Sequence, residues 1–236
     1  PLSKEIFDKT SDDEVILCLN YDGMYGINNI NRVKQQLNPN KEYNFGIDTY
    51  KVNDPILFND CPRFNNFLYN NLKGIIKDIE EDEENKCIWF TIEVDKDSIN
   101  EFFRPFDVDI LESEILGKVN ICFKVNEYID KEDDENEYDH IIPFNLSYAI
   151  SIHKAQGLEY DSVKIVITSN IEDRITKNIF YTAITRAKNK LKIYWNSDSQ
   201  TKIFDNFDKR ENNRDLSILR QKIDKKDVEE SEFNLF

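Results

Sequence analysis

Residues 147–167 read SYAISIHKAQGLEYDSVKIVI, a short polar segment that leads directly into an apolar run. The run at 162–167 is rich in β-branched apolar residues, which is typical of a strand buried on both faces of a parallel sheet. Ser151 is a favourable residue to begin a helix, and Gly157 is a favourable residue just past a helix end. The sequence therefore predicts a very short helix over 152–156, followed by a central strand.

Several side chains could add hydrogen-bond donors at the start of this predicted helix. Its first backbone N–H groups and its partial positive charge point outward, which suits a phosphate group. Ser151, His153 and Lys154 lie there, and Glu159 follows just before the strand. The spacing fits a short connector with polar residues facing water equally well.

A second informative stretch, 179–188, reads IFYTAITRAK. Its apolar residues recur at helical spacing as far as Ala187 and leave Thr182 and Arg186 on the opposite side of a predicted helix. The surrounding residues 174–194 contain six Lys or Arg and no acidic residue. This local excess of positive charge fits an anionic partner, and the alternative is an ordinary solvated helix face.

The segments around these two stretches predict an α/β fold with a parallel sheet. The apolar run at 14–19 precedes two glycines and a helical pattern over 27–37, which together form half of an α/β unit. The run at 191–195 is the next predicted strand. A charged tail with scattered apolar residues follows at 197–236, where we predict a helix or two.

The middle of the chain has a different character. Its β-rich runs lie at 73–79, 87–94 and 119–125, and the acidic string 80–84 is predicted to be the solvated tip of a hairpin. The acidic stretch 129–139 is predicted to be a loop. We therefore divide the chain into the first part of an α/β domain at 1–70, an inserted β-rich module at 71–140, the second part of the α/β domain at 141–196 and a charged helical tail at 197–236.

Composition limits the classes of protein to which the chain could belong. Its 236 residues include 16 Phe and 11 Tyr, enough bulky material for a core, and the net charge is −15. Such a charge argues against a surface that binds nucleic acid indiscriminately, although it leaves room for a local basic groove. The sequence has no long apolar span and no C-x-x-C pair among its four Cys. We therefore expect no membrane partner, no bound structural metal and a cytoplasmic location with reduced thiols.

The two stretches resemble motifs V and VI of superfamily 1 helicases, in the RecD-like 1B branch. That family carries Y-A-[IL]-T-I-H-K-[SA]-Q-G-x-E-[FY] and then [LFY]-Y-[TV]-A-[LIV]-T-R-[AG]. Residues 148–160 depart from the first pattern only by Ser151, which keeps the hydroxyl of Thr, and 180–187 match the second. Residues 26–39 are similar to a third family pattern, G-[VI]-x-x-[LI]-N-x-x-[LI]-Q-x-x-[LM]-N-P. The resemblance runs from about Val15 to Trp195.

Two family patterns are degraded in this chain. Asn53 and Asn71 stand where the family has glycine, and because Asn tolerates the left-handed conformation we expect both turns to survive. Tyr21 and Asp22 occupy a position where the family usually has Arg or Lys near the γ-phosphate of ATP. This departure is compatible with weakened hydrolysis, with a cation supplied from elsewhere or with a misaligned loop.

The resemblance implies a RecA-like second motor domain with a small inserted barrel-like module. ATP would bind between this domain and an N-terminal RecA-like domain of the same protein, and single-stranded DNA would cross both. Arg186 would be the arginine finger that stabilises charge on the γ-phosphate. The nucleotide side of the cleft would hold Gln156, Gly157, Glu159 and Arg186. The strand would be contacted by Ser151, His153, Lys154 and Thr182.

The sequence contains no G-x-x-x-x-G-K-[ST] phosphate-binding loop. ATP and Mg²⁺ would therefore belong to the full-length protein, with most ligands supplied by the missing N-terminal half, and we expect this chain alone not to hydrolyse ATP. The chain begins with Pro1, so we expect it to belong to a longer protein. From the resemblance, we expect that protein to be an ATP-dependent DNA helicase of the exodeoxyribonuclease V alpha-subunit type. Such a protein would act in repair and recombination with other nuclease or helicase subunits. The alternatives are a catalytically inactive interaction module and an RNA helicase fragment.

Overall fold

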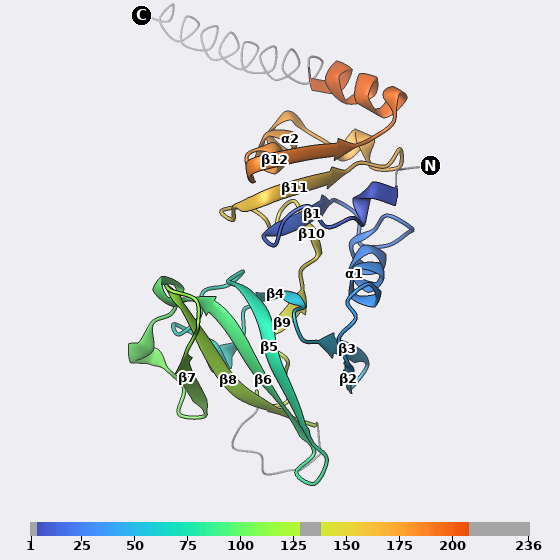
Figure 1. Cartoon of the computed structure of the whole chain (residues 1–236). Helices are drawn as coiled ribbons and strands as arrows, with labels where there is room; N and C mark the ends of the chain where they lie inside the picture. Colours follow the sequence, from blue (N-terminus) through green and yellow to red (C-terminus); the bar gives the residue numbers. More distant parts are fainter. Residues whose placement is uncertain (1–3, 128–137, 208–236) are drawn as a thin grey trace, which may run out of the picture.

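The computed structural model describes residues 4–127 and 138–207 and contains two main sheets (Figure 1). The first sheet has four strands in the order β10-β1-β11-β12, and every neighbouring pair in it is parallel. Its strands are β1 (Glu14–Cys18), β10 (Ala149–Ser151), β11 (Tyr160–Val166) and β12 (Ala187–Tyr194). This arrangement confirms the predicted α/β fold with a parallel sheet.

Helices cover both faces of the parallel sheet because successive strand residues point to opposite sides. On one face, α1 (Ile27–Gln36) packs against Ile16 and Cys18 through Ile27 and Ile30. On the other face lie α2 (Lys177–Ile184) and a helical segment at 197–207. No helix among the described residues is long and apolar enough to cross a membrane.

The second sheet is antiparallel, with six strands in the order β7-β8-β6-β5-β4-β9. Its strands are β4 (Pro55–Phe58), β5 (Lys73–Asp82), β6 (Cys87–Asp95), β7 (Val108–Glu112), β8 (Lys118–Asn126) and β9 (Phe144–Leu146). The antiparallel sheet therefore extends beyond the expected range 71–140 at both ends. Its strands β4 and β9 pair with each other from positions far apart in the chain, and such short strands carry no recognisable period.

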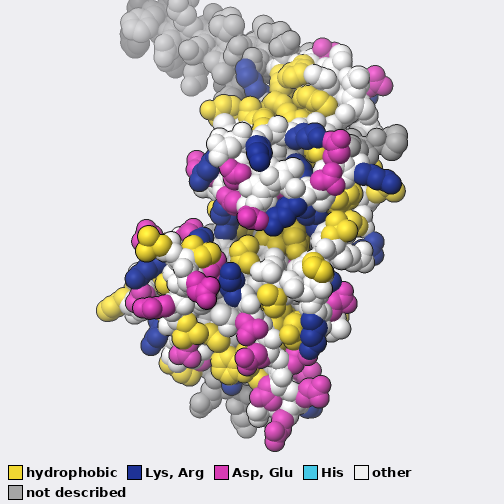
Figure 2. All heavy atoms as spheres, viewed as in Figure 1, with side chains coloured by type: hydrophobic (Ala, Val, Ile, Leu, Met, Phe, Trp, Pro, Cys, Tyr) yellow, Lys and Arg dark blue, Asp and Glu magenta, His cyan; other side chains and the backbone are white. Residues whose placement is uncertain are grey.

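Phenylalanine rings fill the core of this second sheet. Phe58, Phe90, Phe123 and Phe144 are almost completely buried and meet mostly edge to face. The smaller hairpin of β2 (Glu42–Phe45) and β3 (Asp48–Lys51) leans on this core through Tyr43, Phe45 and Tyr50. Acidic side chains gather at the β5–β6 tip, at the bottom of Figure 2, as expected for a solvated hairpin end.

Short 3₁₀ turns complete the connections. They are Lys4–Ile6, Pro62–Phe64, Lys96–Ser98, Glu101–Phe103 and Glu172–Arg174. Most of the acidic stretch 129–139, and the tail beyond residue 207, lie outside the described residues.

One predicted helix is absent, and the end of another was predicted wrongly. Residues 152–156 form a hydrogen-bonded turn and no helix, since this connection must return from the end of β10 to the start of β11. The predicted helix through Ala187 ends at Ile184, because Ala187 pairs with Tyr160 and begins β12. Strand pairing therefore replaced the helical pattern in the last residues of that stretch.

The two asparagines that replace family glycines adopt left-handed backbone conformations. Asn53 has φ 69° and Asn71 has φ 63°. The backbone N–H of Asn53 donates to the Ile76 carbonyl at 2.7 Å, which ties the β3–β4 turn to β5. The prediction that asparagine preserves both turns is confirmed.

Candidate functional site

The predicted site residues lie at two opposite edges of the parallel sheet. Glu159 and Arg186 immediately precede β11 and β12, whose first residues pair with each other. Ser151 is the last residue of β10 and pairs with Cys18, the last residue of β1. Because parallel strands start at one edge and end at the other, the two groups are separated by the length of the strands.

Arg186 is oriented by three hydrogen bonds at the amino-end edge. Its Nε donates to the Thr182 carbonyl at 2.9 Å, its Nη1 to the Leu158 carbonyl at 2.9 Å and its Nη2 to the Thr185 hydroxyl at 3.0 Å. An arginine side chain has about five N–H donors. The guanidinium is thus held in one plane while part of its donor capacity stays available to an anion.

Glu159 follows Leu158, whose carbonyl accepts from this guanidinium, and its side chain faces solvent. Its carboxylate pairs with Lys188 at 3.4 Å, and both side chains are more than half exposed. The backbone N–H of Tyr160 donates to the Arg186 carbonyl at 2.9 Å, which joins the two strand starts. Leu158, Glu159, Thr182, Thr185, Arg186 and Lys188 are called the amino-end cluster below.

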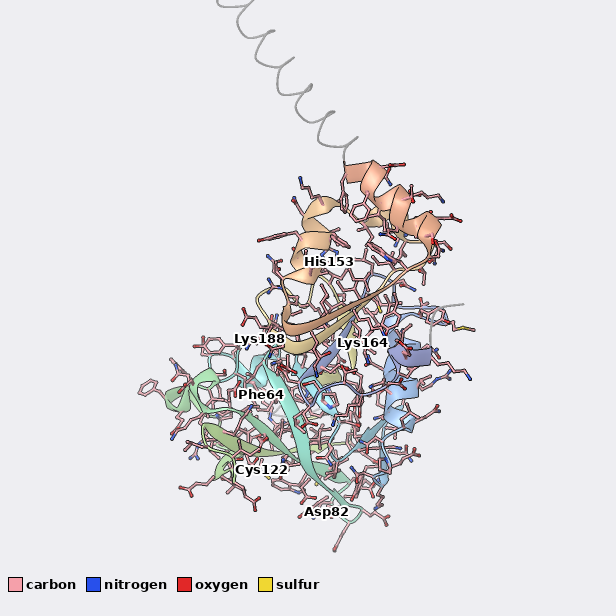
Figure 3. The ribbon with its side chains drawn as sticks, turned by 45° about the horizontal axis from the view of Figure 1, so that its top comes forward. Phe64, Asp82, Cys122, His153, Lys164 and Lys188 are labelled. Carbon is pink, nitrogen blue, oxygen red and sulfur yellow. The ribbon has the colours of Figure 1, made fainter. Side chains whose placement is uncertain are left out.

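The antiparallel sheet contacts the amino-end cluster through one lysine. Lys73 Nζ, at the start of β5, donates to the Glu159 carbonyl at 2.9 Å and to an Asp13 carboxylate oxygen at 2.9 Å. Figure 3 labels Lys188 beside the junction of the two sheets. The inserted module therefore helps to define the position of the strand starts that carry the cluster.

The remaining predicted residues are divided between these places. Thr182 lies with Arg186, since its carbonyl accepts from that side chain, and it is separate from Ser151. Gln156, Gly157 and His153 are exposed on the turn between the edges, and Gly157 has φ 86°. Thr182 therefore lies beside Arg186, which was expected to contact the nucleotide, and away from Ser151, which was expected to contact single-stranded DNA.

A groove of about 530 Å³ lies beside the carboxyl ends of β1 and β10. Ser151 and Lys154 line it, together with side chains from α1 and from the β2–β3 hairpin. The Ser151 hydroxyl accepts from the Lys154 backbone N–H at 3.1 Å and so caps the turn in the manner expected of an N-cap. This cavity is called the groove below.

Several groove residues were missed by the sequence reasoning. Arg32 stands on the polar side of α1 and could have been found from the helical pattern. Tyr21 and Ile47 also line the groove and are exposed. The family resemblance put Tyr21 at a position near the γ-phosphate, whereas the structure has it in the groove, at the edge of the sheet opposite Arg186. Ile47 lies at a hairpin tip, and no signal in the sequence marks it.

A buried carboxylate, Asp54, holds the walls of the groove together. It is 0% exposed and accepts from Gln35 Nε2 at 2.6 Å, Tyr148 Oη at 2.7 Å and Asn38 Nδ2 at 2.8 Å. A fourth bond comes from the Lys51 backbone N–H at 3.0 Å. Burial raises the pKa of Asp54 above its ordinary value, and these hydrogen bonds oppose the shift. Asp54 thus links α1, the β3–β4 turn and the segment before β10.

Asn31 of α1 attaches this helix directly to β10. Its side-chain amide donates to the Ala149 carbonyl at 2.9 Å, and its side-chain oxygen accepts from the Ala149 backbone N–H at 2.7 Å. The amide therefore pairs with Ala149 much as a neighbouring strand would. Among the described residues, no group of three His, Cys, Asp or Glu side chains is arranged to hold a metal ion.

Comparison with known proteins shows that the chain is similar to helicases. Residues 146–194 match the family model of the UvrD-like helicase C-terminal domain. The chain is 28% identical over 192 residues to the RecBCD enzyme subunit RecD of Buchnera aphidicola, covering 81% of this chain and 26% of that protein. It is 30% identical over 131 residues to the ATP-dependent DNA helicase Pif1 of Campylobacter jejuni, covering 53% and 25%.

Among solved structures, the chain is similar to the Pif1 helicase of Candida albicans, with a TM-score of 0.45 and 16% identity, covering 79% of this chain and 46% of that one. The chain spans about a quarter of the length of the two curated relatives named above.

Proposed function

Because this chain is homologous to superfamily 1B helicases of the RecD and Pif1 type, we propose that it is the C-terminal motor part of an ATP-dependent DNA helicase or translocase. It supplies an arginine finger and contacts to single-stranded DNA. A separate RecA-like domain supplies the phosphate-binding loop and most ligands of ATP and Mg²⁺.

The observation that carries the proposal is the geometry of Arg186 and Glu159. The two side chains leave adjacent starts of parallel strands, and three neutral acceptors orient the guanidinium. A cation held in this way stabilises negative charge that develops on a transferred phosphoryl group without first reorganising. In this proposal the Glu159 carboxylate accepts from a hydroxyl of the same nucleotide, and Gln156 and Gly157 line the same side of the cleft.

The groove at the carboxyl ends of β1 and β10 supports the proposed contacts to single-stranded DNA. The groove is lined by two cations, Arg32 and Lys154, and by Ser151, whose hydroxyl caps the turn that follows β10. A nucleotide and a nucleic-acid strand would therefore bind at different edges of one sheet. Movement of this sheet relative to the phosphate-binding domain would link hydrolysis to displacement along the strand.

The test is Arg186→Ala in the natural protein that carries this chain. DNA-stimulated ATP hydrolysis should fall by about 10³-fold or more, because loss of an arginine finger costs that much in related phosphoryl transfers. Single-strand affinity, measured by fluorescence anisotropy, should stay within about twofold, since the groove lies at the other edge.

Two controls make this result specific. Thr185→Val removes one acceptor of the guanidinium and keeps its charge, so it should cost much less activity than Arg186→Ala. Arg174→Ala changes a cation outside the cluster and should have no effect on hydrolysis. Unchanged hydrolysis in Arg186→Ala would exclude the proposed finger and favour a non-catalytic interaction module.

A further inference from the structure

The loop after β1 departs from the helicase pattern in a way that points to a different contact. Tyr21 is uncharged and Asp22 is anionic, so this loop offers no cation to a phosphate. The Tyr21 side chain is 50% exposed and lines the groove beside Ser151 and Lys154. An aromatic ring in that place offers a flat apolar surface to whatever fills the groove.

The tip of the β2–β3 hairpin supplies a second apolar surface. Ile47 is fully exposed at the tip and lines the same groove. The hairpin itself is held in place, since Phe45 pairs with Asp48 and packs against the core of the antiparallel sheet. Gly46 has φ 62°, which lets the turn project its next side chain outward. Ile47 thus contributes nothing to the core and stands on an anchored support.

Most amide side chains of the groove are already engaged within the protein. Asn31 pairs with Ala149, and Gln35 donates to Asp54 and to the Thr49 carbonyl. The groove therefore has few free donors with which to read the edges of bases. Its remaining features are two cations, the carboxylate of Asp48 and the exposed apolar surfaces of Tyr21 and Ile47.

We propose that Tyr21 and Ile47 form a base clamp, which holds the bases of an unpaired nucleic-acid strand while its phosphates face Arg32 and Lys154. This inference rests on the proposed function, because it assumes that the strand enters the groove. Every base has an apolar face, so the clamp tolerates any sequence. With two cations at the groove, the dependence of log affinity on log salt should have a slope of about −1.4.

The experiment uses the 236-residue chain, a labelled oligothymidylate and a labelled oligomer of equal length in which abasic sites replace the bases. Both carry the same phosphates, so the difference between their affinities measures contact with bases. Fluorescence anisotropy over a range of salt should give about tenfold tighter binding to oligothymidylate.

Substitutions then assign that preference to the clamp. Tyr21→Ala should remove most of it, whereas Tyr21→Phe keeps the ring and should preserve it. Ile47→Ala should reduce it by a smaller factor, because an aliphatic side chain stacks less well than a ring. All three changes are at exposed positions, so the circular dichroism spectrum should not change.

The possible outcomes separate the clamp from the proposed function. Equal affinity for both oligomers, or an undiminished preference in Tyr21→Ala, overturns the clamp. If binding then still depends on Arg32 and Lys154, single-stranded DNA binds in the groove through its phosphates, and only the base clamp is rejected. An absence of binding to either oligomer at every salt concentration overturns the clamp together with the proposed strand contacts of this chain.

Discussion

The amino-end cluster and the groove are built in different ways, although they flank the same four-stranded sheet. The cluster comes from residues 158–160 and 182–188, and main-chain carbonyls of those segments orient its guanidinium. The groove draws residues from Tyr21 to Lys154 and includes α1, a hairpin and a turn. A local motif can therefore build a charged catalytic group, whereas a surface for an extended polymer needs several distant segments.

This difference implies that the groove depends on a buried connector and the cluster does not. Asp54 receives bonds from three of the segments that form the groove walls. Arg186 donates its hydrogen bonds to Thr182 and Thr185, which lie within four residues of it, and to Leu158, which lies just before β11. Substitution of Asp54 should therefore disturb the groove more than the amino-end cluster.

The largest effect is expected from Asp54→Leu. It removes the acceptor of four hydrogen bonds, two buried and two part-buried, so the free energy of unfolding in urea should fall by about 3 kcal/mol. The affinity for single-stranded DNA should fall as well, because the segments that form the groove walls are no longer joined by the Asp54 carboxylate. The matched change Asp82→Leu, at the hairpin tip labelled in Figure 3, removes only two exposed hydrogen bonds from Asn85, so it should cost much less stability and leave the affinity for single-stranded DNA unchanged. Equal stability of the two variants would show that Asp54 connects nothing.

A smaller effect should appear in the pH dependence of stability. Because burial raises the pKa of Asp54, the folded chain holds this proton more tightly than the unfolded chain. Its contribution to stability is therefore present at low pH and is lost as the pH rises through the folded pKa. The stability of the natural chain relative to Asp54→Asn should accordingly be greater near about pH 4, close to the ordinary pKa of Asp, than near about pH 7. The opposite trend would mean that the hydrogen bonds outweigh burial.

The smallest effect is expected from Lys154→Ala. Removing one cation should weaken single-strand binding by about two- to fivefold and lower the salt slope by about 0.7. The rate of ATP hydrolysis at saturating DNA should remain unchanged in the natural protein, in contrast to Arg186→Ala. Lys188→Ala is the control, since this exposed cation lies at the other edge of the sheet. A large loss of hydrolysis in Lys154→Ala would remove the distinction between the two edges.

Local patterns predicted much of the fold. The apolar runs became β1 and β11, the helical spacing became α1, and the three β-rich runs became β5, β6 and β8. Each of these elements depends on residues a few positions apart, so its signal is contained in a short window. The end of α2 was missed because pairing of Ala187 with Tyr160 outweighed the helical spacing.

The candidate site was predicted in its members but not in its grouping. The motif resemblance singled out Arg186, Glu159 and Ser151, and their roles stay predictions. The spacing predicted that Glu159 comes just before a β-strand, but it did not indicate that Arg186 does so too, or that Ser151 ends a β-strand at the opposite edge of the sheet. For the same reason Thr182 was grouped with the residues predicted to contact single-stranded DNA, although its carbonyl accepts from Arg186.

The sequence by itself determined the positions of α1 and of several strands, and the left-handed turns at Asn53 and Asn71. Those properties depend on neighbouring side chains and on backbone sterics. Only the tertiary structure decided that residues 55–58 would pair with 144–146, and that Tyr21, Ile47 and Lys154 would line one groove. Contacts between distant segments are decided by packing and by buried groups such as Asp54, and no short stretch of sequence contains that information.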